Sequence, residues 1–248
     1  MQENVSRPPC VKKLLVLDIE GTIFQARIRL PGTSIDSTIW QGIAHALGPE
    51  AVREEVETHR RWENGDYPSY TAWMRDTIEI HKRHHLNRDL FQRLVASAQY
   101  NPGVIETLKK IDRTEYELLL ISGGFRELAA RAQRDLSILH AFAACEYLFS
   151  ADGTLEAYNL LPCDFKGKIS FVDLMLREYD LSAQDWVFVG DGLNDALVAK
   201  QAPLSIGYHA HPELKKVVTH TIDSFPDLLE ILKQNKTKPA TKGNHNHG

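Results

Sequence analysis

Two carboxylates that follow an apolar run are the first side chains here whose types and spacing could do chemistry. Residues 14–17 are LLVL, and Asp18 and Glu20 come next in the segment D-I-E-G-T. Two positions apart at the end of an extended segment, both carboxylates can face one site, and Gly21 lets the chain turn sharply. Such a pair suits a nucleophile and a proton donor. The segment also fits a plain turn capped by Thr22, so both interpretations stay open.

A second segment offers a site for an anion. Residues 118–121 are LLLI, and Ser122 and Gly123 follow in I-S-G-G-F before a helical pattern. A hydroxyl and free peptide N–H groups at a strand-to-helix turn suit a phosphate oxygen, because the helix dipole favours negative charge there. A glycine-rich connection with Ser122 as the helix cap explains the same residues.

Two further segments supply charges of both signs. D-F-K-G-K contains Lys166 and Lys168, which are candidate cations before a helix, and G-D-G-L-N-D contains Asp191 and Asp195 on a glycine turn. Carboxylates gathered at a strand end suit a hard, oxygen-binding cation such as Mg²⁺. Surface lysines are common, so the lysine segment is a weak signal by itself.

Short apolar runs alternate with helical patterns along most of the chain. Strands are expected at residues 14–17, 118–121, 186–190 and 203–207, and a β-hairpin at residues 145–160. Helices are expected at residues 103–111, 126–136, 168–179, 194–202 and 226–234. This alternation predicts an open α/β sheet of buried parallel strands. Ligands bind beyond the carboxyl ends of such strands, where Asp18, Ser122 and Asp191 lie.

Residues 34–99 interrupt this alternation with four helical patterns and no convincing strand, which predicts an inserted helical domain. Residues 50–65 form a charged amphipathic pattern with a solvated outer face. Large apolar side chains recur at helix spacing in the other three patterns: Trp40, Ile43 and Leu47; Tyr70, Trp73, Met74 and Ile78; Leu90, Phe91, Leu94 and Val95. These stripes favour a core inside the insertion over an aromatic ligand site.

Composition excludes several classes of protein. The 248 residues exceed one domain of about 150 residues, and 43% hydrophobic with 25% charged residues is typical of a globular chain. A net charge of −4 gives no reason to expect nucleic acid as partner. Three scattered cysteines, no secretory pattern in residues 1–10 and no apolar run of about 18 residues predict a cytoplasmic protein that does not enter a membrane.

The four segments, in this order, resemble the motifs of the haloacid dehalogenase superfamily of aspartate-nucleophile phosphatases. S-G-G-F and G-D-G-L-N-D are most similar to its phosphoserine-phosphatase-like branch. The resemblance implies a Rossmann-like core with parallel strand order 3-2-1-4-5 and an inserted helical cap of the C1 type. The core is then expected at residues 10–24 and 100–232, and the cap at residues 25–99. Residues 233–248 are expected to be a flexible polar tail, and the ending KGNHNHG is typical of a purification tag or a frayed terminus.

The resemblance also implies roles for the motif residues in an Mg²⁺-dependent phosphatase. Asp18 would be the nucleophile that forms an aspartyl-phosphate, and Glu20 the acid that protonates the leaving oxygen and then activates water. Most family members have Asp at the position of Glu20. The remaining roles would be divided as follows: Asp18, the backbone carbonyl of Glu20 and Asp191 hold Mg²⁺; Ser122, Gly123, Lys166 and Asn194 bind phosphate; Asp195 supports the metal and orients Lys166.

The expected substrate is a small phosphorylated metabolite. Phosphoserine phosphatases have an acidic residue nine positions after the nucleophile, where this chain has Arg27, so phosphoserine itself is not expected. Arg75 falls where those enzymes bind the substrate carboxylate. Together, Arg27, Arg29 and Arg75 favour an acidic or multiply phosphorylated small molecule unless they are solvated surface residues. Transfer of the phosphoryl group to an alcohol, or a non-hydrolytic phosphate-binding module, are the alternatives. The sequence leaves open whether the protein is a monomer or a homodimer.

Overall fold

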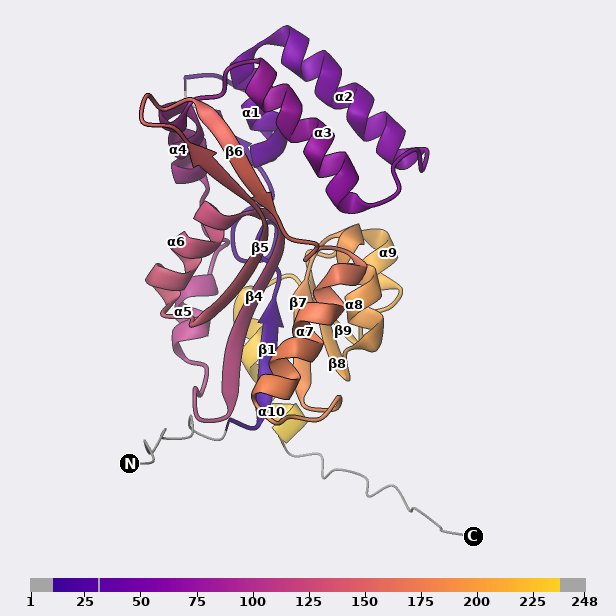
Figure 1. The fold of residues 1–248 in the computed structure, drawn as a ribbon. Coiled ribbons are helices and arrows are strands. Elements are labelled where there is room, and N and C mark those ends of the chain that lie inside the picture. The colour runs from indigo at the N-terminus through magenta and orange to yellow at the C-terminus, as the bar shows by residue number, and fades with distance from the viewer. Residues whose placement is uncertain (1–10, 31, 237–248) are drawn as a thin grey trace, which may run out of the picture.

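The computed structural model describes residues 11–30 and 32–236. A seven-stranded sheet forms its centre (Figure 1). In sheet order the strands are β6 (Leu155–Leu160), β5 (His140–Phe149), β4 (Tyr116–Phe125), β1 (Lys13–Leu17), β7 (Trp186–Gly190), β8 (Leu204–Tyr208) and β9 (His220–Ile222). All neighbours pair in parallel except β5 and β6. The order β5-β4-β1-β7-β8 is the expected 3-2-1-4-5, so the predicted fold class is confirmed.

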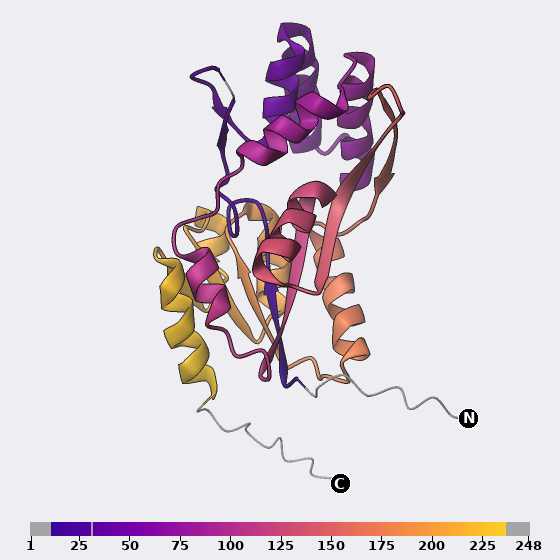
Figure 2. The same ribbon diagram turned by 90° about the vertical axis from the view of Figure 1, so that its left-hand side faces the viewer.

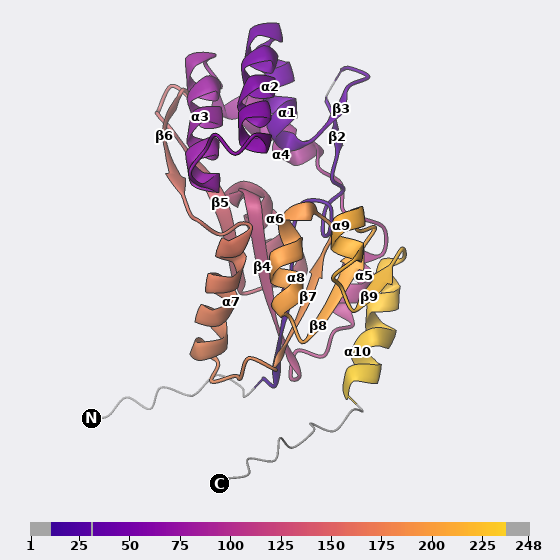
Figure 3. The same ribbon diagram turned by 90° about the vertical axis from the view of Figure 1, so that its right-hand side faces the viewer.

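Helices cover both faces of the sheet (Figures 2 and 3). The helices outside residues 39–97 are α5 (Val104–Lys109), α6 (Arg126–Leu136), α7 (Lys166–Glu178), α8 (Ala196–Gln201), α9 (Pro212–Lys215) and α10 (Leu228–Lys236), with the 3₁₀ turns η1 (Leu193–Asp195) and η2 (Phe225–Asp227). Side chains of β1 alternate between two hydrophobic clusters. Leu15 and Leu17 pack in the cluster of α5, α6 and α10, and Leu14 and Val16 pack in that of α7, α8 and α9. Burial on both faces explains why β1 is a continuous apolar run.

Four helices form a separate layer beyond the carboxyl ends of the central strands (Figure 1). They are α1 (Ile39–Leu47), α2 (Pro49–Glu63), α3 (Tyr70–Arg83) and α4 (Arg88–Ser97), hereafter the helical layer. The hydroxyl of Thr38 caps α1, and the side chains of Ser69 and Asn87 cap α3 and α4. Each of these oxygens accepts a hydrogen bond from a backbone N–H of the first helical turn, which fixes where the helix begins.

Several elements differ from the sequence-based expectations. The strand β4 continues past residue 121 to Phe125, with an irregular register between Ser122 and Phe125. Two-residue strands, β2 (Ile28–Arg29) and β3 (Asp36–Ser37), pair with each other, so the region from residue 34 onward contains a strand after all. The short elements α9 and β9 were not expected, because three or four residues carry too little periodicity to be recognised.

The predicted hairpin is confirmed as β5 and β6, and it rises to the helical layer (Figure 1). No helix in the described part of the chain is long and apolar enough to cross a membrane. Of the expected tail, residues 233–236 belong to α10, and residues 237–248 lie outside the described residues.

Candidate active site

The site begins where three neighbouring parallel strands end. Asp18 directly follows β1 and Asp191 directly follows β7, while Ser122 lies near the carboxyl end of β4. The backbone N–H of Asp18 donates to the carbonyl of Val189 at 2.9 Å, which places these two strand ends side by side. Gly21 then turns the chain with φ of 95°, a left-handed conformation that other residues rarely adopt. A Cβ there would lie 2.0 Å from Oδ2 of Asp191, so only glycine fits.

A fully buried lysine lies among these carboxylates. Nζ of Lys168, in the first turn of α7, donates to Oδ1 of Asp18 at 2.5 Å and to Oδ1 of Asp195 at 2.6 Å. Asp164 lies 3.6 Å from the same nitrogen. Burial alone would lower the pKa of Lys168, but these carboxylates hold it well above its ordinary value. Lys168 is therefore a fixed positive charge against Asp18.

This arrangement corrects the expectation for Lys166. The side chain of Lys166 is exposed, and Asp195 orients Lys168 instead. The reason is the phase of α7, whose buried face comprises Lys168, Val172, Met175 and Leu176. Positions 168, 172 and 175 share one helix face, whereas position 166 points away from it. That spacing was present in the sequence and would have selected Lys168.

The donor set around Asp18 fits a hard divalent cation. Carboxylate oxygens of Asp18, Asp191 and Asp195 lie within 4.8 Å of one another. Oδ2 of Asp195 accepts hydrogen bonds from the backbone N–H groups of residues 191 and 192, and Oδ1 accepts from Lys168, so its role is to organise the cluster. Oδ1 of Asp191 accepts from Thr22 at 2.9 Å. Among the described residues, the second oxygens of Asp18 and Asp191 accept no hydrogen bond, and all-oxygen donors suit Mg²⁺.

Glu20 has the properties of a general acid. Its Oε1 is buried and has no hydrogen-bond partner among the described residues. Burial, reinforced by the charge of Asp164, raises the pKa of Glu20 to about 7. Gly124 leaves room for this oxygen, since a Cβ there would lie 1.7 Å from it. A carboxyl group with this pKa can hold a proton at neutral pH and release it during a reaction.

The remaining expected polar groups surround the same space. The hydroxyl of Ser122 is buried and accepts from the backbone N–H of Gly124 at 2.9 Å. Nδ2 of Asn194 donates to Oδ1 of Asp164 at 2.8 Å. The structure therefore brings together Asp18, Glu20, Ser122, Gly123, Asn194, Asp191 and Asp195, as the sequence predicted.

These groups form the floor of a cavity of about 780 Å³ between the sheet and the helical layer. The floor comprises Asp18, Glu20, Ser122, Gly123, Gly124, Asp164, Phe165, Leu193 and Asn194. The opposite wall comes from the loop before α1 and from α1 to α3: Thr38, Trp40, Gln41, Glu55, Val56, His59, Arg60, Trp62, Glu63, Tyr70, Trp73, Met74 and Thr77. The floor contains carboxylates and polar groups, whereas the wall comes from other elements and has many apolar side chains. This division is typical of an enzyme that selects its substrate by contacts to the non-reacting part of the substrate molecule.

Comparison with known proteins decides the family. The family model for haloacid dehalogenase-like hydrolases matches residues 12–203 of the chain. The chain belongs to this family. The matched region contains every floor residue and every wall residue, so the site lies inside the family domain.

Curated relatives of this chain are phosphoserine phosphatases. The enzyme of Methanocaldococcus jannaschii is 30% identical over 90% of this chain and 97% of its own length. Those of Idiomarina loihiensis and Archaeoglobus fulgidus are 32% and 25% identical. The matches cover 56% and 90% of this chain, but only 62% and 60% of those two relatives.

Solved structures agree in fold. A phosphoserine phosphatase with an analogue of its phospho-aspartyl intermediate superimposes with a TM-score of 0.69, at 23% identity and over 90% of this chain and 99% of that one. A probable phosphoserine phosphatase from Vibrio cholerae gives a TM-score of 0.73 at 18% identity, over 93% of this chain and 69% of that one. Both show that the haloacid dehalogenase-like chain shares their fold.

The expected substrate arginines of this hydrolase are not at its cavity. Neither Arg27 nor Arg75 lines the cavity, and both side chains are exposed. Arg27 donates instead to the carbonyl of Asp36, in the β2–β3 hairpin. Arg27 is nine positions after Asp18, but the chain forms the β2–β3 hairpin there, so this spacing does not bring the side chain of Arg27 into the site. The structure therefore removes the reason to expect an acidic substrate.

Several wall and floor residues were not predicted from the sequence. The aromatic stripes were assigned to the core of the insertion, and Ile43 and Ile78 are buried there. Trp40 and Tyr70 pack against the core clusters but also line the cavity, as does Trp73. Tryptophan and tyrosine at the edge of an apolar stripe were the available signal, because their polar atoms need a partner or water. Asp164 and Glu55 were missed because single carboxylates near a helix start or on a charged helix face carry no pattern.

Proposed function

We propose that this protein is a Mg²⁺-dependent phosphomonoester hydrolase that works through an aspartyl-phosphate on Asp18. The observation that carries the proposal is the pair of bonds from buried Lys168 to Asp195 and to Asp18, which lines the cavity. A carboxylate about 4 Å from a phosphate charge meets a repulsion of about 4 kcal/mol at an effective dielectric of 20. Lys168 offsets this repulsion at the nucleophile itself.

The reaction divides between two carboxylates. An oxygen of Asp18 attacks phosphorus and forms an acyl-phosphate bond as the bond to the leaving oxygen breaks. Glu20 gives its proton to that oxygen, and the alcohol leaves. Glu20 then takes a proton from water as the water oxygen attacks phosphorus, which releases phosphate and restores the Asp18 carboxylate.

The other floor residues hold the phosphate in line for this attack. Ser122, Gly123 and Asn194 offer a hydroxyl, a peptide group and an amide to the phosphate oxygens. Asp18, Asp191 and the backbone carbonyl of Glu20 would hold Mg²⁺, which supplies positive charge to the phosphate oxygens when bound. Positioning and charge of this kind provide most of the catalysis of phosphoryl transfer.

The helical layer belongs to the cap of this enzyme. The cap comprises residues 25–99, and the core comprises residues 10–24 and 100–232. The cavity wall that it provides would exclude water and bind the leaving group of a small phosphorylated metabolite. Arg60, the arginine in this wall, is paired with Glu57, which argues that the metabolite lacks the carboxylate of phosphoserine.

Phosphate release tests the proposal directly. Wild-type protein and Asp18→Asn should be compared on a panel of phosphomonoesters that includes p-nitrophenyl phosphate, with Mg²⁺ and with a chelator. The Asn oxygen can still accept the hydrogen bond from Lys168, so the variant should fold normally yet lose at least 1,000-fold in kcat, a loss of about 4 kcal/mol of transition-state stabilisation. Turnover that persists in Asp18→Asn would refute the nucleophile, and turnover that persists without metal would refute the role of Mg²⁺.

A further inference from the structure

The wall of the cavity opposite the floor contains large aromatic side chains from α1, α2 and α3. Trp62 of α2 stacks on Trp73 of α3, with ring centroids 5.0 Å apart and planes 10° apart. Tyr70 meets Trp73 edge-on at 6.0 Å, and Phe165, from the floor, lies 5.5 Å from Trp62. These rings give the cavity an apolar surface with several π systems, and the faces of such rings attract organic cations.

One carboxylate in this wall has no partner. Four charged side chains of α2 line the cavity, and three of them are already paired. His59 lies 3.4 Å from Glu63, and Arg60 makes two hydrogen bonds to Glu57. Glu55 makes no hydrogen bond or ion pair with any other described side chain, and it lies half-buried in the cavity wall. Its burial without a compensating charge raises the pKa of Glu55 to about 7.

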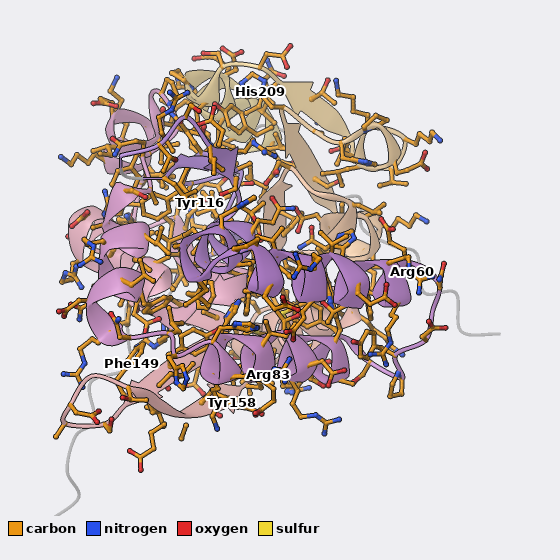
Figure 4. The ribbon with its side chains drawn as sticks, turned by 90° about the horizontal axis from the view of Figure 1, so that it is seen from above. Arg60, Arg83, Tyr116, Phe149, Tyr158 and His209 are labelled. Carbon is orange, nitrogen blue, oxygen red and sulfur yellow. The ribbon has the colours of Figure 1, made fainter. Side chains whose placement is uncertain are left out.

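Among the described residues, no arginine or lysine of the wall is left unpaired for an acidic group on a substrate. Arg60, the one arginine or lysine of the described chain that lines the cavity, is paired with Glu57 and lies at the outer end of α2 (Figure 4). Arg27 and Arg75, which were expected to bind a substrate carboxylate, lie elsewhere. A half-buried carboxylate with no charged partner is costly, and a cationic ligand would offset that cost.

We infer that the leaving group of the substrate carries an organic ammonium cation on an apolar body and no carboxylate, with Glu55 and the ring faces of the cavity wall as its binding site. This inference rests on the proposed phosphatase activity, since it concerns the other half of the same substrate. A leaving group of this kind differs from that of phosphoserine, which has both an ammonium and a carboxylate.

Two esters of equal shape test the charge alone. Phosphocholine and 3,3-dimethylbutyl phosphate differ only in a quaternary nitrogen that replaces a quaternary carbon. We expect wild-type kcat/KM to be at least 10-fold higher for phosphocholine than for either the neutral ester or O-phosphoserine. In Glu55→Gln, the ratio of kcat/KM for phosphocholine to kcat/KM for 3,3-dimethylbutyl phosphate should fall to about one, whereas Glu50→Gln should retain the wild-type ratio. Glu50 has the same charge on the same helix but pairs with Arg53 outside the cavity.

A binding measurement keeps the inference separate from the activity. Calorimetry with choline and with 3,3-dimethylbutanol needs no turnover, and choline should bind more tightly to wild type, with a loss of at least fivefold in Glu55→Gln. Hydrolysis of p-nitrophenyl phosphate with no preference for the cationic ester would overturn the inference and leave the phosphatase proposal standing. Choline binding that requires Glu55, in a protein that hydrolyses no ester, would support the cation-binding site at Glu55 but overturn the phosphatase proposal and the assignment of the cation to a leaving group. Equal binding of choline and the neutral alcohol would overturn the inference in either case.

Discussion

At the scale of single residues, the floor depends on one cation among several acids. Lys168 is 0% exposed, and Asp18, Asp164 and Asp195 all lie within 4 Å of its nitrogen. Removal of a charged group from water is expensive unless a partner remains, so these four side chains are stable only as a set. Lys168 therefore stabilises both the folded arrangement of these acids and the negative charge of Asp18.

Substitutions of Lys168 and of Lys166, on the same helix, should distinguish the roles of the two lysines. Lys168→Met should lower kcat at least 100-fold and the free energy of unfolding by about 3–5 kcal/mol, because buried carboxylates lose their cation. Lys166→Met, on the exposed side of α7, should change both quantities little. Phosphate release and urea unfolding measure the two effects, with circular dichroism to select conditions in which the variant is folded. A Lys168→Met enzyme within 10-fold of wild type would contradict this role.

The residues of the floor were largely predictable, because each follows a strand end that the apolar runs already mark. Asp18, Ser122 and Asp191 are in this class. The sequence prediction chose Lys166 in place of Lys168. The motif shows that a lysine precedes the helix, but only the helical periodicity of α7 shows which lysine side chain points toward the carboxylates. Glu55 was beyond prediction, because what distinguishes it from Glu57 on the same helix is the absence of a partner, and partners come from the tertiary structure.

At the scale of elements, hydrogen bonds join the helical layer to the sheet both at the floor of the cavity and away from it. Away from the floor, Nδ1 of His81 and the hydroxyl of Tyr147 on β5 are 2.6 Å apart, and Tyr158 of β6 donates to Glu79 of α3 at 3.0 Å. At the floor, the hydroxyl of Tyr70, the first residue of α3, donates to the carbonyl of Gly123 at 2.5 Å. Tyr70 thus joins the cavity wall to the loop that is proposed to bind phosphate.

Loss of the Tyr70 hydroxyl should loosen the wall at the cavity alone. Tyr70→Phe removes one hydrogen bond of about 1 kcal/mol, so kcat/KM should fall about fivefold while the ring still packs on Phe165. Tyr158→Phe removes the comparable bond on the far side and should leave kcat/KM unchanged. Steady-state kinetics with p-nitrophenyl phosphate measure both variants. Equal losses in the two variants would show that the effect is general loosening of the layer.

The same elements show how far periodicity predicts a fold. The four helical patterns in residues 34–99 became α1 to α4, and α6 has the bounds 126–136 that the sequence predicted. Periodicity reports that a face is apolar, but not whether another helix or a ligand will cover it. The aromatic residues of α1 and α3 illustrate the difference, since Ile43 meets the core whereas Trp73 meets the cavity.

At the scale of the whole molecule, the topology concentrates negative charge at one end of the sheet. Parallel strands all end at the same edge, so the carboxylates that follow β1 and β7 are brought together with Asp164 before α7. The net charge of −4 over the entire chain gives no hint of this concentration. Because Lys168 is a single cation among these acids, a divalent cation should bind the folded state in preference to the unfolded chain, whose carboxylates are dispersed.

This preference predicts that Mg²⁺ stabilises the protein against heat. At a concentration about 10 times its Kd, a ligand of the native state adds about 1.4 kcal/mol, which raises Tm by about 3–6 °C in a chain of this size. Asp191→Asn keeps an oxygen for the hydrogen bond from Thr22 but loses its charge, so the shift with Mg²⁺ should disappear and Tm in chelator should rise as repulsion falls. Asp223→Asn removes the same charge from an exposed site and should retain the full shift. Differential scanning calorimetry with and without Mg²⁺ distinguishes the two variants, and an equal shift in both would place the cation away from the floor of the cavity.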